Sequence, residues 1–94
     1  MNKNIVSKFA PHHAFVKDIF ANAKTPAAAS QASDMVANVA TLEQDCDIQT
    51  ALFVVSSALT EQRHMFICNR LGDSAGAMEH SNRRAYLLGS VGVV

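Results

Sequence analysis

The sequence predicts an all-α fold, a small bundle of three to four helices. From Ala27 to Leu71 the chain contains no glycine and no proline, the two residues that most often interrupt regular structure. The same stretch is rich in alanine, leucine, methionine, glutamine and glutamate, which favour helices. A β-sheet protein would need several turns there, and the usual turn residues are missing. The length of 94 residues corresponds to one domain, 1–94, with less ordered termini expected at 1–10 and 89–94.

The first predicted helix begins near Pro11, because proline is well tolerated in the first helical turn. It should end near Lys24, since Thr25 precedes Pro26 and a residue before proline avoids the helical conformation. Its apolar face consists of Phe15, Val16, Ile19 and Phe20.

The second predicted helix runs from Pro26 to about Gln44, with Thr25 as its N-cap and the proline at the first helical position. Apolar residues recur every three or four positions along it, as expected for one buried face. They are Ala28, Ala32, Met35, Val36, Val39 and Leu42. The alanines should allow a neighbouring helix to approach closely.

The third predicted helix runs from about Ile48 to Leu71, capped by Asp45 or Asp47 and ended by Gly72. Its broad apolar stripe indicates a central helix, with a core formed by Leu52, Val55 and Leu59. Two short runs in this region also permit a strand interpretation, Leu52–Val55 and Met65–Cys68. Helix is favoured because no tight turn separates them.

The fourth predicted helix covers about Ala75 to Leu88. Asp73 or Ser74 can cap its first turn, and Gly89 is the expected stop. Met78, Ala85 and Leu88 share one side of this helix.

Composition and charge exclude several classes of function. Eight basic and eight acidic residues give a formal charge of zero, so no net field attracts nucleic acid or anionic lipid. The longest apolar run, Ala51–Val55, is too short to cross a membrane. Two cysteines without a secretory signal pattern indicate a reducing compartment. We therefore expect a cytoplasmic protein with neither a nucleic acid nor a membrane as its partner.

His64 and Cys68 are the best candidates for metal binding or catalysis, because they share a helical face at i and i+4. Two further zinc ligands would have to come from distant helices. Catalysis by the Cys68 thiol would need an oxyanion-binding loop, and the surrounding segment is predicted to be helix. We therefore expect no metal, no cofactor and no enzymatic activity.

The remaining interpretation is a helical protein–protein interaction module, an adaptor, regulator or chaperone-like subunit. Its large apolar side chains exceed what a thin core of this size can hide. The expected partner-binding residues are Phe15, Ile19, Phe20, Phe53 and Phe66, and we expect a homodimer. The first alternative is a helix-turn-helix regulator spanning Leu59 to Arg84, with Gly72 in the turn. The second is a metal-binding protein based on Cys68 and His64.

Overall fold

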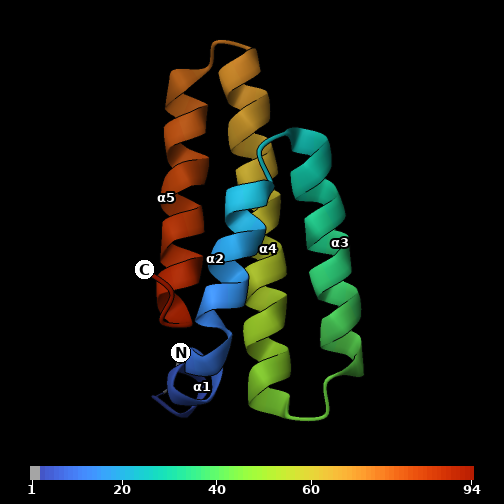
Figure 1. Ribbon diagram of the computed structural model, residues 1–94. Coiled ribbons are helices and arrows are strands. Elements are labelled where there is room, and N and C mark those ends of the chain that lie inside the picture. The colour runs from blue at the N-terminus through green and yellow to red at the C-terminus, as the bar shows by residue number, and fades with distance from the viewer. Residues whose placement is uncertain (1–2) are drawn as a thin grey trace.

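The computed structural model describes residues 3–94, which form helices packed together and contain no strand (Figure 1). This confirms the predicted all-α bundle. The elements are α1 (Lys3–Phe9), a 3-10 turn (Ala10–His12), α2 (His13–Asn22), α3 (Pro26–Leu42), α4 (Cys46–Arg70) and α5 (Ser74–Ser90). Both predicted strand segments lie inside α4, so the strand interpretation is wrong.

Helix α4 is the axis of the bundle. Its 25 residues correspond to about 37 Å of helix, which accounts for the longest dimension of 40 Å. Helices α3 and α5 pack along two sides of α4, and α1 packs near its beginning (Figure 1). Because α3 is shorter and runs antiparallel to α4, the last turns of α4 pair with α5 beyond the start of α3 (Figure 1).

The core forms around α4 as the sequence predicts. Leu52, Val55 and Leu59 are all buried. The other large buried side chains come from every remaining helix except α5 and from the residues that follow α5: Phe9, Val16, Val36 and Val91. The central position of α4 therefore follows from its broad apolar face.

The described parts of both terminal segments, 3–10 and 89–94, contribute to the packing, and the lower order expected for residues 1–10 and 89–94 stays a prediction. Residues 3–9 form α1, which buries Ile5 and Phe9, while residues 1–2 lie outside the described part. Helix α5 continues past the expected stop at Gly89 and ends where Gly92 adopts a φ of +84°. The N–H of Val93 then bonds the carbonyl of Leu88, a Schellman ending that turns Val91 and Val93 into the core.

Capping residues begin three helices where the sequence places them. The side chains of Thr25, Asp45 and Asp73 accept hydrogen bonds from backbone N–H groups at the starts of α3, α4 and α5. Helix α4 ends before Gly72, whose φ of +75° suits glycine.

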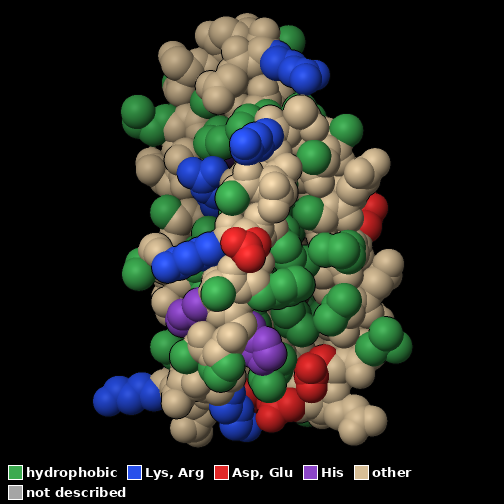
Figure 2. Space-filling model, in the orientation of Figure 1, with side chains coloured by type: hydrophobic (Ala, Val, Ile, Leu, Met, Phe, Trp, Pro, Cys, Tyr) green, Lys and Arg blue, Asp and Glu red, His purple; other side chains and the backbone are tan. Residues whose placement is uncertain are grey.

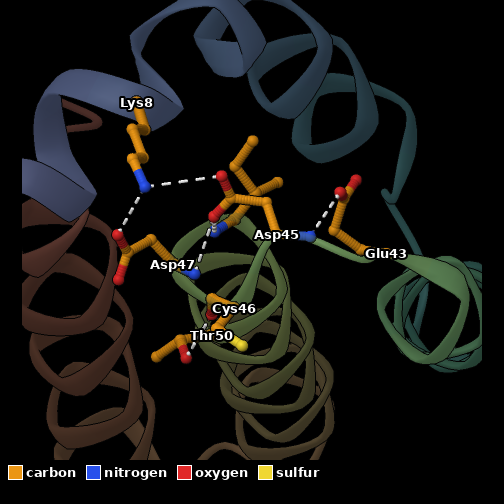
Figure 3. Close-up of polar contacts among 7 residues, drawn as sticks. Lys8, Glu43, Asp45, Cys46, Asp47 and Thr50 are labelled. Carbon is orange, nitrogen blue, oxygen red and sulfur yellow. Dashed lines mark hydrogen bonds and ion pairs between the residues drawn. The ribbon is translucent and has the colours of Figure 1, made fainter.

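The start of α4 is also tied to α1 (Figure 3). Lys8 Nζ lies 2.8 Å from an Asp47 carboxylate oxygen and 3.4 Å from one of Asp45. The hydrogen bond to Asp47 is the main cause that raises the pKa of Lys8. The pKa of Asp45 is lowered, chiefly by the backbone N–H of Ile48. The ion pairs of Lys8 with Asp45 and Asp47 thus hold α1 against the capped start of α4.

Helix α3 faces the core with a side that only partly matches its predicted apolar face, since Val36 is buried as predicted and Ala32 packs against the core from a partly buried position. Its buried residues are Ala29, Ser33, Val36 and Ala40, whereas Met35, Val39 and Leu42 are exposed. Ser33 Oγ lies 2.9 Å from the backbone oxygen and 2.9 Å from the hydroxyl of Ser56 on α4. Small side chains and these paired hydroxyls let the two helices approach closely, and the larger side chains are left on another face.

Candidate functional site

The apolar face of α3 that contains Met35 forms one wall of a surface groove, and α2 forms the other wall. The groove has a volume of about 380 Å³. Figure 2 shows hydrophobic side chains gathered in this region between the two helices. Its lining residues are Phe15, Asp18, Ile19, Asn22, Ala23, Ala28, Gln31, Ala32 and Met35. We call this feature the α2–α3 groove.

The position of α2 is fixed by contacts at its end. The connection from Ala23 to Thr25 is short, and the Gln62 amide donates to the carbonyls of Ala23 (2.8 Å) and Phe20 (3.3 Å). Val16 is fully buried on the inner side of α2. With this side held against the core, Phe15 and Ile19 line the groove.

Two of the five residues expected to bind a partner come together in the groove, Phe15 and Ile19. Phe20 instead lines a separate hollow with Gln62 and Leu88. Phe53 is exposed on α4, and Phe66 is partly buried near the far end of that helix. The structure therefore does not unite the five in one surface.

Sequence reasoning missed the α3 wall as a binding surface, although its signal was visible. Ala28, Ala32 and Met35 belong to the apolar spacing that was assigned to the core. Only one side of a helix can face α4, and the side containing Ser33 does so. The apolar stripe that contains Met35 therefore lines the groove. The exposed side chains of Val39 and Leu42 continue this stripe along α3.

A second cluster lies between α4 and α5, formed by Glu61, His64 and His80. The Nδ1 atom of His80 lies 2.6 Å from Oε2 of Glu61, and the rings of His64 and His80 are 5.1 Å apart between centroids. One ligand atom from each residue falls within 4.8 Å of the other two. This set has the composition of a metal site.

The pair weighed for metal or thiol chemistry, His64 and Cys68, is not joined in this cluster. Cys68 is partly buried and faces the start of α5, where its sulfur would lie 3.1 Å from a Cβ at Gly76. Cys46 is an exposed free thiol at the start of α4. The structure therefore pairs His64 with His80 of the next helix.

The segment weighed for a helix-turn-helix forms an antiparallel hairpin, α4 and α5 joined by the turn at residues 71–73 (Figure 1). A DNA-reading pair of helices crosses at about 90–120°. Arg83 pairs with Glu79, and Arg84 donates to Gln62. These two arginines are engaged within the bundle.

No helix within residues 3–94 has the length and apolarity needed to cross a membrane.

Comparison with protein-family models, curated proteins and solved structures found no match to this chain.

Proposed function

We propose that this protein is a helical interaction module that binds an amphipathic helix of a partner protein in the α2–α3 groove. The observation that carries the proposal is the exposed part of the second apolar stripe of α3, formed by Met35, Val39 and Leu42. Phe15 is 46% exposed and Met35 is 47% exposed, and both line the groove. Apolar grooves between helices are a common site for an amphipathic helix.

The dimensions of the stripe suit a helix. From Ala28 to Leu42 the stripe spans 14 residue steps, or about 21 Å at 1.5 Å per residue. A partner helix of about four turns would cover that length. The small side chains of Ala28 and Ala32 line part of the wall and leave room for larger side chains of the partner.

The charge of the groove indicates which helix it would take. Asp18 is its one charged lining residue, and Asn22 and Gln31 add neutral polar groups. An arginine or lysine at the edge of the partner's apolar face would pair with Asp18. We therefore propose an apolar helix with a basic residue at its edge, because an acidic residue there would be repelled.

A library of helical peptides offers a direct test. We expect selection on this protein to enrich sequences with apolar residues at i, i+3, i+4 and i+7 and a basic residue beside them. Nuclear magnetic resonance titration with an enriched peptide should shift amide signals of α2 and α3. No enrichment, or shifts confined to α4 and α5, would contradict the proposal.

A second copy of the chain is the competing occupant, since a homodimer is expected from the small core and zero charge. Sedimentation equilibrium over a hundred-fold range of concentration separates the two cases. A dimer that Met35→Glu dissociates would assign the groove to self-association. A dimer unaffected by that change would leave the groove free for the partner helix.

A further inference from the structure

We propose that Glu61, His64 and His80 form a zinc-binding site that clamps α4 to α5. This site is separate from the α2–α3 groove and does not depend on the function proposed for it. The sequence predicts no metal, because the further ligands needed beside His64 and Cys68 would have to come from distant helices. The hairpin of α4 and α5 brings the two histidines together.

The spacing of the residues is suited to a shared ion. Glu61 and His64 are three residues apart on α4, which places them on one face of the helix. Helical bundles use the same Glu-x-x-His spacing to hold metals between their helices. His80 completes the set from α5, with its Nδ1 already 2.6 Å from the Glu61 carboxylate.

The ligand atoms match the chemistry of zinc. Two imidazole nitrogens and one carboxylate oxygen form a three-residue zinc set, with a water in the fourth position. Zinc–nitrogen bonds of about 2.0–2.1 Å separate tetrahedral ligand atoms by about 3.3 Å. The three ligand atoms here lie within 4.8 Å of one another, so small side-chain rotations would bring them into range.

The surroundings leave the carboxylate available to the ion. Arg83 lines the same hollow as Glu61, but it is paired with Glu79 on its own helix. The side chains of Glu61 and His80 are 19% and 22% exposed. That exposure lets an ion enter from solvent, while the packing of both helices limits the side-chain freedom that binding must remove.

Calorimetric titration of chelator-treated protein with zinc chloride tests the site. We expect one zinc per chain and a thermal midpoint that rises with zinc concentration. His64→Gln removes one ligand and leaves the His80–Glu61 hydrogen bond in place. It should weaken zinc binding by about tenfold or more, since even changes around metal ligands cost about 10–100-fold. His80→Gln should weaken zinc binding by a similar factor.

Two controls exclude binding elsewhere. Asp34→Asn removes an exposed carboxylate on α3 that is outside the set, and His12→Gln removes one of the adjacent histidines just before α2. Both variants should bind zinc as the unchanged protein does. Absence of zinc binding at neutral pH would overturn the proposal. Undiminished binding in His64→Gln and His80→Gln, with both proteins folded by circular dichroism, would overturn it equally.

Discussion

Gln62 connects three helices through one buried side chain. Its amide nitrogen donates to the carbonyls of Phe20 and Ala23 at the end of α2, and its oxygen accepts a hydrogen bond from Arg84 on α5 at 2.8 Å. The carbonyls at the end of a helix have no partner within that helix. Gln62 therefore supplies hydrogen bonds to a buried carbonyl at Ala23 and a partly buried one at Phe20.

Replacement of Gln62 by leucine should lower the free energy of unfolding by about 1–3 kcal/mol, because it leaves buried polar groups unpaired. Urea denaturation provides the measurement. Gln44→Leu, at an exposed loop position, is the control and should change stability by less than about 0.5 kcal/mol. Equal, small effects at both positions would contradict the role assigned to Gln62.

Asp45 makes the stability of the bundle depend on pH in acid. Its pKa is lowered in the folded protein, first by the hydrogen bond from Ile48 and then by those from Asp47 and Lys8. The resulting stabilisation is present above the pKa of the unfolded chain, and it is lost as the pH falls through the folded pKa. The loss should therefore occur below about pH 4.

Thermal unfolding of Asp45→Asn checks this prediction. Asparagine can still cap the helix, but it lacks the charge that attracts Lys8. The unchanged protein should be the more stable one at pH 7, and the difference should shrink as the pH falls below about 4. A difference that is constant across this range would contradict the assigned cause.

At the scale of the elements, the sequence predicts the starts of α3, α4 and α5 better than the face that α3 buries. Thr25, Asp45 and Asp73 are capping residues whose effect is local, and all three act as predicted. The buried face of α3 depends on its neighbour, since Ser33 meets Ser56 across the contact with α4. Apolar spacing alone could not distinguish this face from the stripe that contains Met35.

Substitutions on the two sides of α3 test its orientation. Ser33→Leu should destabilise the protein by about 1–3 kcal/mol, because the larger side chain cannot fit at the close contact with α4. Val39→Ser, on the exposed stripe, should cost less than about 0.5 kcal/mol. Chemical denaturation of both variants is the measurement, and the reverse order of effects would mean that α3 is rotated.

The α4 core has a direct test of its own. Leu59 is fully buried, so Leu59→Ala should cost about 2–5 kcal/mol from lost apolar contact and the cavity left behind. Phe53→Ala on the exposed side of the same helix serves as the control. It should be clearly less destabilising, as measured by urea denaturation, and equal losses would contradict the position of α4.

At the scale of the whole molecule, the candidate sites depend on contacts between helices that no local pattern reveals. The groove takes Phe15 and Ile19 from α2, which the sequence singles out, and Met35 from α3, which the sequence assigns to the core. His80 joins His64 because α4 and α5 form a hairpin. The residue types were visible in the sequence, whereas their grouping follows from the topology.

Phe15 and Phe53 provide a matched pair for the central claim that the α2–α3 groove binds a partner helix. They are the same residue with similar exposure, 46% and 42%, but only Phe15 lines the groove. The decisive measurement is the affinity of a selected helical peptide for Phe15→Glu and for Phe53→Glu, with folding of both verified by circular dichroism. The proposal predicts a loss of about tenfold or more for Phe15→Glu, as expected when a binding hot spot is removed, and no change for Phe53→Glu. Equal affinities for the two variants, or a loss confined to Phe53→Glu, would contradict it.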